Sequence, residues 1–456
     1  MIHGALETDL YQLTMAAGYF HRGMSGLTAT CELFIRRLPE TRRFLVGMGI
    51  DAALDWLAAV RFQEADIAFL RELPALRDAM TVSFCDYLAK VRFTGDAWAI
   101  EEGTVVFENE PLLRIRAPII EAQLAETFLL STINHATMIG SKAARIVRAA
   151  LPGTVVEFGT RRTHPSSAID AARWAYAAGF SGTSNVEAGR RHGVPVLGTA
   201  AHMWTMAHPS EEQAFANYVA TFPNASILLI DTYDTPRGAL RAARAAGDKL
   251  RGVRLDSGDM DALSRKVRVV LDENGAKSAK IVASGDLNEH SIAALRAANA
   301  PIDTFGVGTE LVASLDAPAL AGVYKVVELE DNGVSRPIAK FSEGKATFPG
   351  AHQVHRVSAE GRARRDVVAL ASEAVPLADG ETATTLLSPV LREGARVRAA
   401  SSLDETRARV ARGLDEIPTW LLDLAPVSRS SPRYEVEPSA GVDALSAELR
   451  EKMVSH

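Results

Sequence analysis

The decapeptide PVLGTAAHMW, residues 195–204, places a single histidine a few residues after a short apolar run. A lone histidine of this kind is most often a packed loop residue. It becomes a candidate for chemistry only when other reactive groups converge on it. For His202, those groups are expected at the ends of other strands.

Two arginines and a glutamate follow the apolar run TVVEFG. The stretch EFGTRRTHP contains Glu157, Arg161 and Arg162. Glu157, if buried, could simply pair with an arginine. Arg161 carries a planar, permanently charged guanidinium, which suits a carboxylate or a phosphate.

Acidic residues end two further strand-like runs. LDSGD contains Asp256 and Asp259, which could bind Mg²⁺ through water, hold ribose hydroxyls or cap the next helix. Asp259 precedes MDALSRKV and suits an N-cap, whereas Asp256 lies nearer the strand. Asp231 ends ILLID and is placed to orient a histidine from a neighbouring strand end.

Small residues end the last two runs and predict a phosphate site. Backbone N–H groups can approach a ligand closely there, and a following helix N-terminus favours an anion. In β/α barrels the final two strand loops commonly bind phosphate. Combined with the acids, Arg161 and His202, they indicate phosphoribosyl chemistry. The residues concerned are Ser284, Gly285 and Asp286, and Gly306, Gly308 and Thr309.

The elements that must position these residues alternate between about residues 154 and 309. Amphipathic, helix-like stretches separate seven apolar runs, which indicates a parallel sheet covered by helices. An open doubly wound sheet and a β/α barrel both fit. The barrel is favoured because polar residues follow every strand. We therefore predict an irregular seven-stranded β/α barrel, with strands at 154–159, 179–185, 195–202, 227–234, 252–259, 280–286 and 302–309.

The flanking regions differ from this pattern. The first 150 residues combine alternating strands with two helices, which predicts an α+β sandwich domain. Strand-like and helix-like stretches return after residue 310. We expect segments 1–150 and 151–330 to be the sandwich and the barrel. Segment 331–456 is expected to pack on both, with its strands completing the sandwich.

Composition excludes several classes of protein. The 456 residues carry a formal net charge of −6 and no long basic run, which argues against nucleic-acid binding. No signal peptide and no run of about 18 apolar residues is visible, so neither export nor a membrane span is expected. Cys31 and Cys85 lie in apolar contexts without metal-ligand spacing and predict buried thiols of a cytoplasmic protein.

Taken in order, the motifs closely resemble the nicotinate phosphoribosyltransferase family over essentially the whole chain. They are TDLYQLTM (8–15), EFGTRRTHP, GFSGTSNVEAG, GTAAHMW, DTYDT, GVRLDSGD, GVGTEL and LLSPVLREG. The resemblance implies a homodimer with shared active sites. It also implies ATP-coupled transfer of a phosphoribosyl group from phosphoribosyl pyrophosphate to nicotinate, with Mg²⁺, in NAD salvage.

The resemblance also implies roles for individual residues. His202 would be phosphorylated by ATP and oriented by Asp231. Phe158 would stack on the pyridine ring, opposite Tyr11 from the other subunit. Asp256 would bind the ribose hydroxyls and the two glycine loops the 5′-phosphate. Arg161 and Arg254 would hold charged groups nearby, and Mg²⁺ would lie near Asp256 and Asp259.

The choice between acid and amide substrate depends on the GTSN loop. Relatives that use nicotinamide have an aspartate there, which accepts a hydrogen bond from the amide. This chain has Ser184. Because a fixed carboxylate would repel nicotinate by several kcal/mol at low dielectric, its absence favours the acid. The chain departs from the family pattern at Met203 and at Thr163-His164-Pro165.

The sequence is compatible with three alternative hypotheses to different degrees. A quinolinate phosphoribosyltransferase shares the architecture, but it would need a denser basic cluster and usually has a shorter chain. A class-I aldolase needs a lysine at a strand end, and Lys280 lies at a strand start. A non-catalytic nucleotide sensor is disfavoured by the presence of His202, Asp231 and Asp256.

Overall fold

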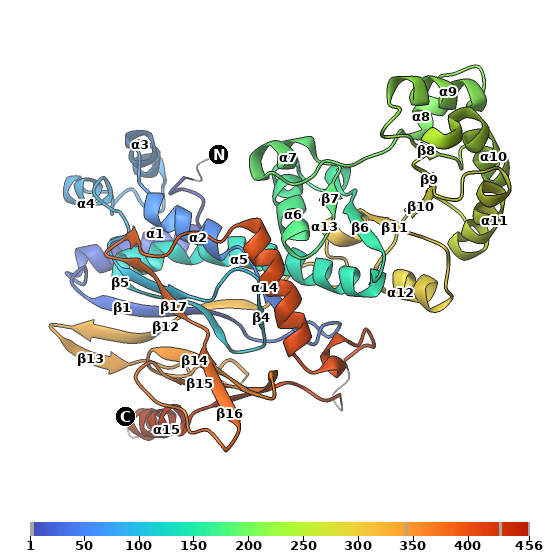
Figure 1. The fold of residues 1–456 in the computed structure, drawn as a ribbon. Helices are drawn as coiled ribbons and strands as arrows, with labels where there is room; N and C mark the ends of the chain where they lie inside the picture. Colours follow the sequence, from blue (N-terminus) through green and yellow to red (C-terminus); the bar gives the residue numbers. More distant parts are fainter. Residues whose placement is uncertain (1–3, 343, 428–430, 455–456) are drawn as a thin grey trace. The chain divides into compact units, whose positions relative to one another are not determined.

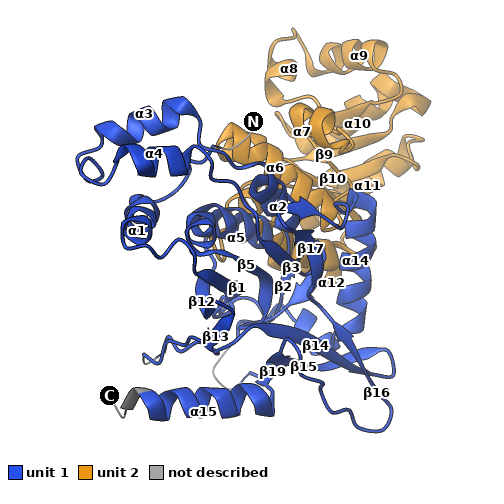
Figure 2. Cartoon of the chain, turned by 90° about the vertical axis from the view of Figure 1, so that its left-hand side faces the viewer, with its two compact units in different colours: residues 1–138, 319–456 blue, residues 139–318 orange. Residues whose placement is uncertain are grey.

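The computed structural model describes residues 4–342, 344–427 and 431–454 (Figure 1). The chain forms two compact units (Figure 2). Unit 1 comprises residues 1–138 and 319–456, and unit 2 comprises residues 139–318. The first and last of the three expected segments therefore contribute to the same unit.

The main sheet of unit 1 draws strands from both ends of the chain. Its order is β13-β12-β1-β5-β3-β17-β18, and central strand β1 pairs antiparallel with both β12 and β5. Seven of the eight residues of β1 are buried, as its central position requires. C-terminal strands thus complete the sheet that N-terminal strands begin. The strands are β1 (Thr28–Ile35), β3 (Asp96–Ala99), β5 (Pro111–Pro118), β12 (Gly322–Asp331), β13 (Val334–Pro337), β17 (Ser388–Arg392) and β18 (Ala395–Arg396).

Unit 1 contains a second sheet, ordered β16-β14-β15-β19, that was not predicted from the sequence. Its hairpin turns at Glu360 and Gly361, both with positive φ, as a two-residue turn between twisted strands requires. The first half of β15, RARR, lacks apolar alternation, so the strand signal there is weak. The strands are β14 (His352–Ala359), β15 (Arg362–Leu370), β16 (Glu381–Thr385) and β19 (Glu435–Pro438).

Seven α-helices and a two-stranded ladder of β2 (Leu45–Gly47) and β4 (Thr104–Val106) occur in the described part of unit 1. The 32-residue helix α5 begins in unit 1 and ends in unit 2. A capping box between Ser402 and Glu405 starts α14. The helices are α1 (Leu10–His21), α2 (Ile50–Ala59), α3 (Glu64–Glu72), α4 (Val82–Leu88), α5 (Ile119–Ala150), α14 (Leu403–Glu416) and α15 (Ala440–Val454), with the 3-10 turn η3 (Thr419–Leu422).

Unit 2 contains a six-stranded parallel sheet ordered β7-β6-β11-β10-β9-β8 (Figure 1). Most of the strand residues are buried, as expected for a parallel sheet that is covered on both faces. The strands are β6 (Thr154–Glu157), β7 (Gly182–Thr183), β8 (Ile227–Leu229), β9 (Gly252–Leu255), β10 (Lys280–Ala283) and β11 (Thr304–Val307). The helices are α6 (Pro165–Ala177), α7 (Val186–His192), α8 (His202–Met206), α9 (Glu211–Thr221), α10 (Thr235–Ala246), α11 (Met260–Glu273), α12 (Glu289–Ala297) and α13 (Thr309–Val312), with the 3-10 turns η1 (Thr160–Arg162) and η2 (Gly247–Lys249).

The seventh predicted strand is reduced to a single bridge. Residues 195–202 contribute only the parallel bridge from Val196 to Thr183. Pro195 has no N–H group to donate, so a ladder cannot continue through it. Within the described residues, β8 has only β9 as a hydrogen-bonded neighbour. The sheet is curled, and a seven-stranded barrel is not confirmed.

Polar caps connect the strand ends of unit 2 to the helices that follow. The side chains of Asn185, Asp234, Asp259 and Asn288 accept hydrogen bonds from the first turns of α7, α10, α11 and α12. Such caps satisfy N–H groups that have no partner inside the helix. Each loop is therefore held between a buried strand and a capped helix.

Two further sequence expectations concern cysteines and membranes. Cys31 and Cys85 are both buried and unpaired, as predicted. In the part of the chain that the structure describes, none of the helices is long and apolar enough to span a bilayer.

Candidate active site at the strand ends of unit 2

Arg254 of β9 is the centre of the polar groups at the strand ends. Its Nη2 donates to Asp256 Oδ1 at 2.7 Å, and its Nε donates to Ser284 Oγ at 2.8 Å. Its Nη1 donates to Thr199 Oγ1 at 3.0 Å. The Ser284 hydroxyl lies 2.6 Å from the same Asp256 oxygen. Because β9 and β10 are adjacent parallel strands, their ends bring these groups together.

The Asp256 carboxylate is held in its charged form. Burial is the largest influence and opposes ionisation, but the Ser284 hydrogen bond and the Arg254 charge outweigh it and lower the pKa of Asp256. Both of these groups bind Oδ1. The other oxygen, Oδ2, lies 3.8 Å from Nε2 of His202. Asp256 can therefore still interact with a ligand.

His202 is the first residue of α8, and 41% of its side chain is exposed. Its Nδ1 lies 3.2 Å from the Thr232 hydroxyl, and its Nε2 faces Asp256. Asp231, which the sequence suggested as the orienting partner, instead accepts from the backbone N–H of Asp256 at 2.9 Å and from the Ser257 hydroxyl at 2.7 Å. Asp231 therefore orders the loop after β9, and the described partners of the ring are Thr232 and Asp256.

Phe158 contacts Arg254 and the loop that contains Gly306 and Gly308. The Arg254 guanidinium carbon is 5.2 Å from its ring centroid, within the range of a cation–π contact. A Cβ atom at Gly306 would come within 2.4 Å of the Phe158 ring, so a larger residue cannot be placed there without displacing the ring. Gly285 has φ +92°, and a Cβ there would lie 2.2 Å from the Asp256 carbonyl oxygen. Both glycines are required by close packing around the site.

Glu157, which directly precedes Phe158 in the sequence, is completely buried. Its carboxylate accepts from the backbone N–H of Gly159 and from the Thr183 hydroxyl, rather than from the arginine that the sequence suggested. Burial raises the pKa of Glu157, although these two hydrogen bonds lower it in part. Its backbone carbonyl also accepts from Ser184 N–H at 2.9 Å. Glu157 thus joins the loop of Phe158 to the loop of Ser184.

The remaining expected site residues have separate positions. Asp259 caps α11 through a hydrogen bond from Ala262 N–H, which agrees with the capping alternative. At the family departure, His164 caps α6 by accepting from Ser166 N–H. The others are Arg161, exposed in η1; Asp286, exposed with φ +48°; Gly308, beside the Phe158 carbonyl; Thr309, which starts α13; Met203, 81% exposed; and Tyr11 of unit 1, 48% exposed.

Two threonines in contact with the site residues were not predicted as site residues from the sequence. Thr199 lies in the GTAAH motif, three residues before His202. Thr232 lies in the DTYD motif, directly after Asp231. Their hydroxyls contact Arg254 and His202. Their position in these motifs was the only sequence signal that they belong to the site. The fold shows that the Thr199 hydroxyl faces Arg254 and the Thr232 hydroxyl faces His202.

A magnesium site at these strand ends would have few ligands from the protein. Over the described ranges, no three His, Cys, Asp or Glu side chains are grouped as ligands of a metal. Mg²⁺ commonly uses only one or two carboxylates together with water and substrate phosphates. Asp256, charged and with Oδ2 available, fits that pattern. Asp259 fits less well because its Oδ1 caps a helix.

The sequence matches two family descriptions. Residues 6–134 match the nicotinate phosphoribosyltransferase (NAPRTase) N-terminal domain, and residues 154–345 match the nicotinate phosphoribosyltransferase (NAPRTase) family.

Individual relatives agree with these matches. The chain is 44% identical over 436 residues to nicotinate phosphoribosyltransferase pncB2 of Mycobacterium tuberculosis, covering 94% of this chain and 91% of the relative. It is 42% identical to the nicotinate phosphoribosyltransferase of Bacillus subtilis, over 81% and 77% of the two chains. The fold is similar to the crystal structure of human nicotinic acid phosphoribosyltransferase, with a TM-score of 0.83, 28% identity and coverage of 97% and 99%.

Proposed function

This chain belongs to the nicotinate phosphoribosyltransferase family, and from that premise we propose that it makes nicotinate mononucleotide. The pyridine nitrogen of nicotinate displaces pyrophosphate from the anomeric carbon of phosphoribosyl pyrophosphate. Hydrolysis of ATP to ADP and phosphate is coupled to this transfer. The observation that carries the proposal is the joint position of Arg254, Asp256, Ser284 and His202 at adjacent strand ends.

The nicotinate ring is proposed to stack on Phe158. Arg254 lies within cation–π distance of this side chain and supplies positive charge for the carboxylate. Arg161, exposed in η1, would hold a further charged group. Tyr11 is exposed on α1 and would cover the other face of the ring from a second copy of the chain. A homodimer with shared active sites is part of this proposal.

The phosphoribosyl part is proposed to bind between Asp256 and the two glycine loops. Asp256 would accept hydrogen bonds from the ribose hydroxyls. Ser284 to Asp286 and Gly306 to Thr309 would supply backbone N–H groups to the 5′-phosphate. Mg²⁺, held by Asp256 together with substrate oxygens, would neutralise the charge of the leaving pyrophosphate. Positive charge that develops on the ribose during bond breaking is stabilised by the Asp256 carboxylate.

His202 is proposed to accept the γ-phosphoryl group of ATP. The phosphoryl group passes to a ring nitrogen, ADP leaves, and the phosphohistidine is later hydrolysed. Thr232 and Asp256 flank the two ring nitrogens and so fix the orientation of the imidazole. A phosphoryl group there adds negative charge beside the pyrophosphate site, which can alter substrate affinity and favour product release.

Ser184 supports nicotinate rather than nicotinamide as the substrate. It is half-buried and holds no charge that would repel a carboxylate. We also retain the cytoplasmic location as a prediction from the two unpaired cysteines.

The experiment is product formation by the purified protein with phosphoribosyl pyrophosphate and Mg²⁺. Nicotinate and nicotinamide are compared, each with and without ATP. We expect turnover of nicotinate that ATP stimulates. Preference for nicotinamide would contradict the argument from Ser184, and turnover of neither substrate would contradict the proposed activity.

A further inference from the structure

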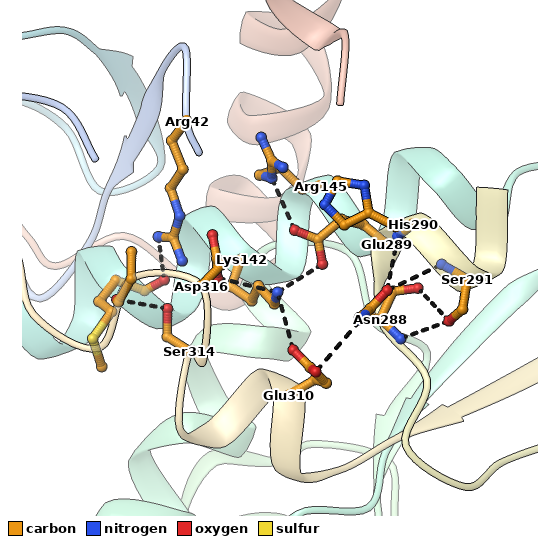
Figure 3. Close-up of polar contacts among 12 residues, drawn as sticks. Arg42, Lys142, Arg145, Asn288, Glu289, His290, Ser291, Glu310, Ser314 and Asp316 are labelled. Atoms are coloured by element: carbon orange, nitrogen blue, oxygen red, sulfur yellow. Dashed lines mark hydrogen bonds and ion pairs between the residues drawn. The ribbon is translucent and has the colours of Figure 1, made fainter. Parts of the chain in front are cut away.

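A buried group of charges lies behind the two glycine loops of unit 2. The ammonium of Lys142, from the end of α5, pairs with Glu289 at 2.7 Å, Asp316 at 3.1 Å and Glu310 at 3.5 Å (Figure 3). One turn along α5, Arg145 pairs with the other oxygen of Glu289 at 3.1 Å. Side-chain exposure is 1% for Lys142 and 0% for Glu289. We name these five residues the Lys142 cluster.

The residues that Lys142 joins begin the helices after the loops. Glu289 is the first residue of α12 and follows the loop of Ser284 to Asn288 directly. Glu310 is the second residue of α13 and follows the loop of Gly306 to Thr309. Asn288 also donates to Glu310 at 3.4 Å while it caps α12 (Figure 3). The two loops are therefore fastened to each other and to α5.

Stability alone is a weak explanation for such a cluster. Removing charged groups from water is unfavourable, and apolar replacements of buried pairs are often neutral or stabilising. One cation shared by carboxylates from three segments does, however, specify the distances between those segments. Phosphate binding by backbone N–H groups depends on such distances, because the donors cannot adjust independently.

We propose that Lys142 is a positioning residue for the phosphoribosyl substrate. It sets the spacing of the two glycine loops so that their N–H groups converge on one phosphate. Lys142 does not touch the substrate. This inference rests on the proposed function for the identity of the ligand. It predicts an effect on the phosphoribosyl substrate that is absent for nicotinate.

The test compares Lys142→Met with Lys142→Arg, which keeps the charge. Arg356→Met in unit 1 is the matched control, since it also removes a buried cation from a carboxylate. The KM values for phosphoribosyl pyrophosphate and for nicotinate are measured separately. Binding of ribose 5-phosphate is measured by calorimetry, and all variants are compared below their unfolding temperatures.

We expect Lys142→Met to raise the KM for phosphoribosyl pyrophosphate, and the Kd for ribose 5-phosphate, about 10-fold or more. The KM for nicotinate should stay within about twofold, and Lys142→Arg should recover most of the affinity. Arg356→Met should lower stability without changing the KM for either substrate. Equal effects on both substrates, or an effect on stability alone, would overturn the proposal.

A milder variant covers the case in which Lys142→Met does not fold. Glu310 is 20% exposed, so Glu310→Gln removes one ion pair at the edge of the cluster. Glu310→Gln should raise the KM for phosphoribosyl pyrophosphate and the Kd for ribose 5-phosphate by a smaller factor than Lys142→Met does. If both constants are unchanged, the proposal is overturned. Calorimetry also separates this proposal from the enzymatic one. If the wild type binds ribose 5-phosphate but makes no nucleotide, the proposed activity fails. A larger Kd for ribose 5-phosphate in Lys142→Met would still support the positioning role.

Discussion

Each unit contains an arginine bound to an aspartate, and the two sites differ in what they leave accessible. In unit 1, Arg356 binds Asp366 with Nη2 to Oδ2 at 2.5 Å, and the Tyr434 hydroxyl donates to Oδ1 of Asp366 at 2.9 Å. Asp366 is completely buried. Phe107 stacks on Tyr434 with 3.8 Å between ring centroids. We call Glu110, Arg356, Asp366 and Tyr434 the unit 1 cluster.

In unit 2, Arg254 binds Asp256 at 2.7 Å, but 26% of the Asp256 side chain and 41% of the His202 side chain are exposed. The unit 1 cluster is enclosed, with both aspartate oxygens bound. In the strand-end cluster of Arg254, Asp256, Ser284 and His202, Oδ2 of Asp256 and Nε2 of His202 face each other at 3.8 Å, beyond hydrogen-bond distance. Both sites pair an arginine with an aspartate, so the residue types do not distinguish an enclosed structural site from a candidate binding site. The exposed fraction of the side chains and the carboxylate oxygens without a hydrogen bond do distinguish them.

Burial raises the carboxyl pKa in both clusters, but the net pKa shifts have opposite directions. In unit 1, burial and the neighbouring Asp366 charge raise the pKa of Glu110 well above its ordinary value. In unit 2, Ser284 and Arg254 overcome burial and lower the pKa of Asp256. The exposed cluster therefore keeps a charged carboxylate available for a ligand.

The largest expected effect follows from replacing His202 by alanine. ATP should no longer stimulate nucleotide formation, because the proposed phosphoryl acceptor is gone, while some uncoupled transfer remains. The measurement is the initial rate with and without ATP. Met206→Ala on the same short helix, exposed by 66%, is the control and should keep normal stimulation. Undiminished ATP stimulation in His202→Ala would remove His202 from the coupling.

Asp256→Asn tests whether the accessible carboxylate is reactive. Loss of the charge should lower kcat/KM about 100-fold, since the proposed electrostatic stabilisation of the ribose is lost. Asp259→Asn is the matched control, because asparagine caps a helix as well as aspartate does. A comparable loss in Asp259→Asn would mean that Asp259 also serves the substrate or its metal.

Asp366→Asn makes the corresponding change in the enclosed cluster. Arg356 is left without its counter-charge, and the free energy of unfolding should fall by about 3–5 kcal/mol. Activity per folded molecule should be unchanged. Denaturant unfolding measures the first quantity, and the exposed Asp379→Asn should stay within about 0.5 kcal/mol of the wild type. A specific loss of activity in folded Asp366→Asn would break the comparison.

The smallest effect concerns the pH dependence of stability. Because the folded-state pKa of Asp256 is lowered, its ionisation stabilises the fold above the ordinary aspartate pKa of about 3.9. This contribution is lost as the pH falls through the lower folded-state pKa. The difference in unfolding free energy between wild type and Asp256→Asn should be constant above about pH 5 and shrink below about pH 4. A difference that grows as the pH falls below 4 would contradict the assigned direction.

Much of the strand-end cluster could be predicted from the sequence by itself. Strand and helix periodicity indicates alternating elements, and parallel strands place their carboxyl ends together. Asp256 and Ser284 were therefore expected near one another, and β9 and β10 lie side by side in register. The motifs around His202 and the glycine loops also identified the family.

Tertiary structure alone decided which side chains face each other. Asp231 and Thr232 are adjacent in the chain, and the backbone path after β8 places the hydroxyl of Thr232, rather than the Asp231 carboxylate, against His202. Closure of the sheet depends on hydrogen bonds between distant segments, and residues 195–202 form only the bridge from Val196 to Thr183. Arg145 and Glu289 are 144 positions apart, and no local pattern reports a pair at that separation. Local periodicity determines elements, whereas packing between distant segments determines partners.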